Sequence, residues 1–168
     1  MDITIEFLSA IINAFEANKR LADRAIEQVP DDKLHVAIDG NTNSIAVIMK
    51  HVAGNLTSRW TDFLTTDGEK PDRDRDGEFT PHGPSSRAGL LTMWNDGFAV
   101  AFAAIDALTP GDLEKIITIR QQPMSVIAAL ERSVTHLAYH VGQIVYLSRH
   151  FAFASGKWTT LSMPKVKK

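Results

Sequence analysis

Four long runs of apolar residues at three- and four-residue spacing constrain the fold of this chain more than any other feature. The runs cover residues 5–29, 45–63, 91–108 and 127–153. This spacing places apolar side chains on one face of an α-helix, so each run predicts an amphipathic helix. Four such helices predict an all-α fold, and we expect a four-helix bundle. With 168 residues the chain can bury the core of one domain, and we expect residues 1–168 to form a single domain.

Residues that start helices stand at the ends of these runs. Side-chain oxygens of Ser and Asn accept hydrogen bonds from the unpaired N–H groups of a helix N-terminus, and proline suits the first helical turn. The expected starts are Asn43 or Ser44 for the second helix, Ser85 or Ser86 for the third and Pro123 for the fourth. We expect the apolar and β-branched segment 115–120 to form a short extended piece before the last helix.

A long link, residues 67–84, joins the second and third predicted helices and is rich in glycine, proline and charge. Links of this length are uncommon in compact domains and are usually functional or disordered. This one is long enough to return along the bundle, which would make the second and fourth helices antiparallel. Its arginines Arg73 and Arg75 could clamp an anionic substrate. The expectation we favour is a solvated loop whose charges pair with one another.

Composition excludes several classes of function. Lys and Arg number 18 against 20 Asp and Glu, and this balance argues against nucleic-acid and membrane-surface partners, which favour a basic excess. Without cysteine the chain has no disulfide, no thiolate ligand and no catalytic thiol of its own. The longest fully apolar run, Phe98 to Ile105, is too short to span a bilayer, and no signal peptide is evident. We therefore expect a cytoplasmic protein.

Histidine placement is the strongest functional signal. His136 and His140 are about one helical turn apart, so both rings project from one face of the last helix. On helical wheels these rings and that of His51, in the second helix, lie on the same rotational side of the apolar stripe. Antiparallel second and fourth helices would turn these flanks toward each other. Three histidines from two helices would hold a divalent metal ion with open coordination positions, the pattern of a catalytic site. The alternative is a chance pair of histidines on a polar helix face.

Polar side chains near these histidines are candidates for binding substrate or orienting the ligands. The candidates are Asn55 and Arg59 in the second helix and Tyr139 and Gln143 in the fourth. We expect Asn55, Arg59 and Gln143 to serve the chemistry, while a solvated polar flank is an equal alternative for Arg59 and Tyr139. The other histidines, His35, His82 and His150, lie in predicted loops or off this helix face and are left out of the site. His82 could fold back onto the site, but we favour a surface role for it.

The segment from His136 to Gln143, His-Leu-Ala-Tyr-His-Val-Gly-Gln, together with His51, resembles the motif of the DinB/YfiT-like metalloprotein superfamily. The blocks 51–60, 67–79 and 158–164 are similar to an uncharacterised subgroup of it. The resemblance implies an up-down-down-up bundle, often a homodimer, with nickel or zinc on His51, His136 and His140. Characterised members include transferases that use low-molecular-weight thiols, such as bacillithiol or mycothiol, and a thiol-dependent isomerase.

Three functions are compatible with such a site. The first is a metal-dependent transferase that joins a low-molecular-weight thiol to a small-molecule substrate. The second is a metal-dependent hydrolase, which we rank lower because no Asp or Glu occupies the histidine flank to serve as a general base. The third is a non-enzymatic metal-binding stress or interaction protein. Family resemblance alone does not choose among them.

Overall fold

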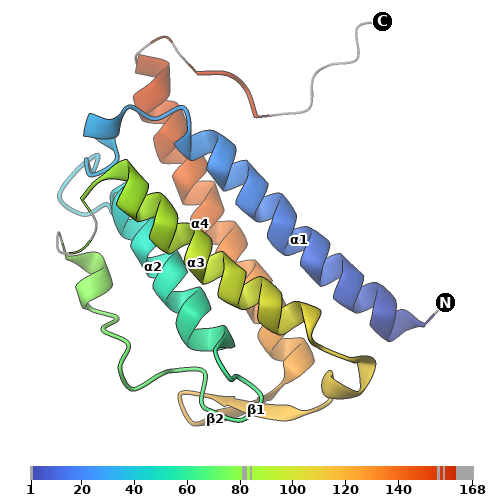
Figure 1. The fold of residues 1–168 in the computed structure, drawn as a ribbon. Helices are drawn as coiled ribbons and strands as arrows, with labels where there is room; N and C mark the ends of the chain where they lie inside the picture. Colours follow the sequence, from blue (N-terminus) through green and yellow to red (C-terminus); the bar gives the residue numbers. More distant parts are fainter. Residues whose placement is uncertain (1, 81–82, 84, 155, 157, 162–168) are drawn as a thin grey trace, which may run out of the picture.

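The computed structural model describes residues 2–80, 83, 85–154, 156 and 158–161. Four long helices pack side by side (Figure 1), and the predicted all-α bundle is confirmed. The helices are α1 (Ile3–Ile26), α2 (Ile45–Trp60), α3 (Arg87–Asp106) and α4 (Val126–Ala154). Three single turns of 3-10 helix and one two-stranded hairpin complete the described fold.

Side-chain caps fix the starts of the second and third helices. Ser44 accepts a hydrogen bond from the backbone N–H of Val47, and Ser86 accepts one from Gly89. These bonds satisfy N–H groups that have no partner inside the helix, and they select Ser44 and Ser86 from the predicted pairs. The prediction that Pro123 starts the fourth helix is wrong, because Pro123 lies in a β-hairpin.

The hairpin consists of β1 (Ile116–Ile119) and β2 (Gln122–Ser125), which pair antiparallel. It confirms the extended piece at 115–120. Pro123 lies within β2 opposite Thr118, and α4 starts only at Val126. The tight turn between the strands pairs the residues around Pro123 with β1, so the strand takes precedence over the preference of proline for a first helical turn.

The helices run in two directions. Figure 1 shows α2 and α3 running the same way along the bundle, with α1 and α4 running the opposite way. Contacts agree for α2 and α4: Trp60 at the end of α2 donates to Ser133 early in α4, at 3.3 Å. Residue Ile48, early in α2, lines a hollow together with Leu147, late in α4. The segment between α2 and α3 therefore returns along the length of the bundle, beside α2.

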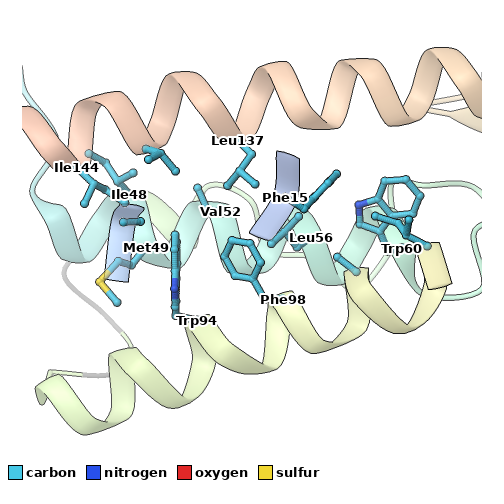
Figure 2. Close-up of a cluster of buried hydrophobic side chains, with 14 of the residues drawn as sticks. Phe15, Ile48, Met49, Val52, Leu56, Trp60, Trp94, Phe98, Leu137 and Ile144 are labelled. Atoms are coloured by element: carbon cyan, nitrogen blue, oxygen red, sulfur yellow. The ribbon is translucent and has the colours of Figure 1, made fainter. Parts of the chain in front are cut away.

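Aromatic side chains fill the centre of the bundle (Figure 2). Trp94 and Phe98 of α3 are fully buried, and Phe15 of α1 meets the ring of Trp60 edge-on at 6.3 Å. The buried indole N–H of Trp94 donates to Asp23 at 2.9 Å, so its burial leaves no unpaired donor. Phe15, Trp60, Trp94 and Phe98 thus belong to the hydrophobic core of the bundle.

Helix α3 has a composition that needs comment. Within the part of the chain that the structure describes, it is the one helix long and apolar enough to cross a membrane. Its buried residues are Leu90, Trp94, Gly97, Phe98, Ala101 and Ile105. These side chains pack in the core of the bundle, which accounts for part of the apolar character of the helix.

The hairpin is tied to the segment that follows α2. Arg120 and Gln121 form its turn with positive φ angles of 54° and 61°. Their N–H groups donate to the carboxylate of Asp67 at 2.9 and 2.7 Å. Burial would raise the pKa of Asp67, but the N–H of Glu69 together with these two backbone bonds lowers it to about 2. Gly68 donates to the carbonyl of Thr118 at 2.8 Å. The hairpin is thereby fixed beside the end of α2.

Candidate metal centre

Three histidines converge between α2 and α4. The Nε2 atom of His136 lies 3.3 Å from Nε2 of His51 and 3.2 Å from Nε2 of His140. The ligand atoms of all three lie within 4.8 Å of one another. His51 and His140 are each 5% exposed, and His136 is half-buried. The structure thus brings together the three residues predicted as metal ligands, from positions far apart in the sequence.

The far side of two rings is held by acceptors. Nδ1 of His51 lies 2.8 Å from a carboxylate oxygen of Glu78, and Nδ1 of His140 lies 2.9 Å from the amide oxygen of Gln143. Both partners accept a hydrogen bond, so each Nδ1 carries the proton and each Nε2 presents its lone pair to the centre. Orientation of this kind is typical of metal-ligating histidines. Gln143, expected to serve the chemistry, lies behind a ligand ring and orients it.

The spacing of the nitrogen atoms fits a metal ion. Zinc–nitrogen bonds of about 2.0–2.1 Å at tetrahedral angles separate two ligand nitrogens by about 3.3–3.4 Å. The two separations of 3.3 and 3.2 Å from Nε2 of His136 match this value. The donor set and the spacing together make this cluster a site where one divalent ion could bind.

The environment of the cluster keeps two of its imidazoles, those of His136 and His140, neutral. Burial, followed by the proximity of His140 and His51, lowers the pKa of His136 to about 3. Burial also lowers the pKa of His140 to about 4, although the hydrogen bond to Gln143 opposes the shift. Both rings are therefore unprotonated near pH 7, the form that binds a metal ion.

A cavity of about 260 Å³ adjoins the cluster, and His51 and His136 form part of its wall. Asn55 and Arg59 line it, one and two turns along α2 from His51, as the sequence placed them. Tyr139 stands at the same wall, with its ring 4.0 Å from the ring of His140. Apolar side chains of α2, the turn after it and β1 complete one side: Trp60, Phe63, Ile117 and Ile119. The cluster is thus open to a space of small-molecule size.

The remaining histidines stay outside this arrangement. Nε2 of His35 lies 2.9 Å from the carbonyl oxygen of Ser85, and exposed His150 packs its ring beside Phe151. His82 lies outside the described residues. Neither His35 nor His150 belongs to the three-histidine cluster.

Comparison with known proteins identifies the family. The model of the DUF1572 family, described as a protein of unknown function, matches residues 2–167. The chain belongs to the DUF1572 family. A search of curated proteins found no match. Among solved structures, the chain is similar to a conserved protein from Enterococcus faecalis, with 17% identity and a TM-score of 0.64 over 90% of this chain and 98% of that one. At this identity the likeness supports the fold alone.

Sequence reasoning missed Glu78, the acid that contacts the ring of His51 in this DUF1572 protein. Glu78 comes from a single 3-10 turn, Gly77–Phe79, in the segment between α2 and α3. Its carboxylate receives Nε of Arg73 at 2.8 Å and Nη2 at 2.9 Å. Burial would raise the pKa of Glu78, but the hydrogen bonds from His51 and Arg73 hold it below its ordinary value. The statement that no acid occupies the histidine flank was wrong, because the acid arrives from a loop that no helical period describes.

The same segment corrects the expectation for its arginines. Arg73 was expected to lie in a solvated loop, but its side chain is only 5% exposed. It bridges Glu78 and Glu69, whose carboxylate lies 3.5 Å away. Arg75 keeps about half of its side chain exposed and follows the expectation more closely. Burial of Arg73 was hidden in the sequence, because the charged run from Asp72 to Asp76 gives no sign of which side chain turns inward.

Proposed function

We propose that this protein is a metal-dependent enzyme with nickel or zinc bound by His51, His136 and His140. The observation that carries the proposal is the convergence of three histidine Nε2 atoms beside a cavity. A divalent ion held there would act as a Lewis acid and lower the pKa of a thiol or water that it binds. His51 and His140 supply lone pairs in an orientation that their Nδ1 partners already fix.

We propose that the reaction is transfer of a low-molecular-weight thiol to a small-molecule electrophile. In this reaction a sulfur–carbon bond forms, the bond to the leaving group breaks, and the thiol proton leaves with that group. The chain has no cysteine, so a sulfur nucleophile has to come from outside. Trp60 and Phe63 exclude water from one wall of the cavity, while Asn55 presents an amide that can orient a bound molecule. The resemblance to the DinB/YfiT-like superfamily supports this reaction class.

Hydrolysis is the less supported reaction. Its general base would need a free carboxylate at the cavity, and the lining residues include no Asp or Glu. Glu78 is close, but its oxygens are engaged by His51 and Arg73, so it is a positioning residue for the His51 ring.

The homodimer and the cytoplasmic location stay predictions.

The test is a transfer assay with metal-loaded protein, a panel of bacterial thiols and a chromogenic electrophile. The proposal expects a rate above that of the metal-free protein and loss of this rate in His136→Ala. No rate above the metal-free control with any thiol would reject the transferase. A protein that keeps its metal but shows neither turnover nor a ligand-dependent thermal shift would favour a non-enzymatic metal-binding role.

A further inference from the structure

The wall of the cavity is unusually rich in arginine. Within the described part of the chain, five arginines line it, contributed by α2, the following segment, the hairpin turn and α4: Arg59, Arg73, Arg75, Arg120 and Arg132. No acidic residue is among the lining residues that the structure describes. Guanidinium groups recognise carboxylates and phosphates through paired hydrogen bonds, and a cavity lined with one sign of charge concentrates ligands of the other.

The carboxylates around the cavity do not balance these charges. Glu69 lies 2.6 Å from Arg59 and 2.9 Å from Arg120, and it also serves Arg73. The second acid, Glu78, is shared between Arg73 and a histidine. Two carboxylates therefore pair with three arginines. Among the described residues, Arg75 has a weaker partner and Arg132 forms no ion pair.

The two remaining arginines are available to a ligand. Arg132 is exposed and forms no ion pair within the part of the chain that is described. Arg75 lies 3.9 Å from Asp76, whose side chain is 98% exposed, and solvent weakens such a pair. Both therefore offer their donors to the cavity without first breaking a buried interaction.

Arg73 supplies an independent indication. Its Nη1 atom is buried and forms no hydrogen bond among the described residues: it lies 3.5 Å from a carboxylate oxygen of Glu69, while the other two nitrogens bind Glu78. A buried donor without a hydrogen bond is costly even beside an opposite charge, and native proteins rarely keep one. Since Arg73 belongs to the wall of the cavity, an acceptor oxygen of a bound molecule would satisfy this donor.

We propose that the cavity binds an anionic small molecule, with its carboxylate or phosphate group held by the arginines and its reacting group directed toward the three histidines. The inference deepens the proposed function and rests on it for the role of the histidines, but the anion site itself rests on the arginines alone. It narrows the substrate or the thiol cosubstrate to molecules that carry such a group.

The test measures binding of succinate and inorganic phosphate by calorimetry, with the uncharged succinamide as the matched probe. The full chain is used both zinc-loaded and metal-free, so that anions bound by the metal are separated from anions bound by arginine. Arg132→Gln removes an exposed, unpaired arginine and should leave the fold intact, as thermal unfolding would verify. Arg149→Gln, exposed on the same helix and outside the lining residues, is the control.

We expect at least one anion to bind wild type and Arg149→Gln with equal affinity in both metal states, and Arg132→Gln to bind it about tenfold more weakly or worse. Succinamide should not bind. Absence of binding for both anions, equal binding by Arg132→Gln, or binding confined to the zinc-loaded form would overturn the proposal. Anion binding without thiol transfer would remove the proposed reaction and leave the anion site standing. Thiol transfer without arginine-dependent binding would remove the anion site and leave the proposed reaction standing.

Discussion

Helix α2 presents two different surfaces to its neighbours. Toward α3 it packs without space: a Cβ atom added at Gly97 would lie 2.9 Å from the Cα and the carbonyl oxygen of Ala53. Toward α4 it presents His51 and the wall of a cavity. The contrast shows that one helix separates the two tasks, since close backbone contact holds the fold on one side while polar groups assemble the site on the other.

The largest effect should follow from enlarging the close contact. In Gly97→Val the added atoms meet backbone atoms of Ala53, which cannot move aside as a side chain can. We expect the free energy of unfolding to fall by about 3 kcal/mol, measured by urea denaturation. Gly142→Val on the open face of α4 is the control, because nothing lies within 4 Å of its added Cβ. Equal losses in the two variants would show that α2 and α3 are not held by close contact.

On the opposite surface, Glu78→Gln should weaken metal binding while the bundle stays folded. The neutral amide orients the His51 ring less strongly, and loss of such a partner typically costs about 10–100-fold in metal affinity. Competition with a chromophoric chelator measures this change. The exposed residue Glu131 provides the control variant Glu131→Gln. An unchanged dissociation constant in Glu78→Gln would mean that its contact with His51 does not support the ligand.

Mild acid should destabilise the metal-free protein through the histidines between α2 and α4, and not through the close contact between α2 and α3. Unfolded histidine has a pKa near 6.5, whereas the pKa of His136 is lowered to about 3 and that of His140 to about 4. Below about pH 6.5 these two histidines therefore bind protons in the unfolded chain but stay unprotonated in the folded chain. The free energy of unfolding consequently decreases as the pH is lowered. We expect metal-free protein to lose stability between pH 7 and about pH 5.5, measured as the urea midpoint.

In that experiment the double variant His136→Gln, His140→Gln should show a flatter pH profile than wild type. An identical slope in both proteins would place the acid sensitivity elsewhere in the chain.

The smallest effect concerns the hairpin that borders the cavity. Gln121 adopts a φ of 61°, which glycine tolerates without steric cost. Gln121→Gly should therefore raise the free energy of unfolding by up to about 1 kcal/mol, a change that thermal unfolding can detect. The neighbouring variant Gln122→Gly, within β2, should destabilise. A loss of stability in Gln121→Gly would show that the turn is not strained.

The helices and the ligands could be predicted because both follow the helical period. The spacing of His136 and His140, and the position of His51 beside its apolar stripe, define directions in space once the helices pair. Glu78, Arg73 and the hairpin turn follow no such period. Their positions depend on buried ion pairs and on Asp67 holding the turn, which are contacts between segments far apart in the sequence. Pro123 shows the same limit, since strand pairing determined its place.

The decisive measurement is the metal content of freshly purified protein, wild type beside His136→Ala, together with the unfolding temperature of each. Three converging imidazoles predict one nickel or zinc ion per chain in wild type and none in the variant, which should stay folded because His136 is only half-buried. A folded His136→Ala that retains a full equivalent of metal, or a wild type that takes up no divalent ion even on reconstitution, would contradict the assignment of this site.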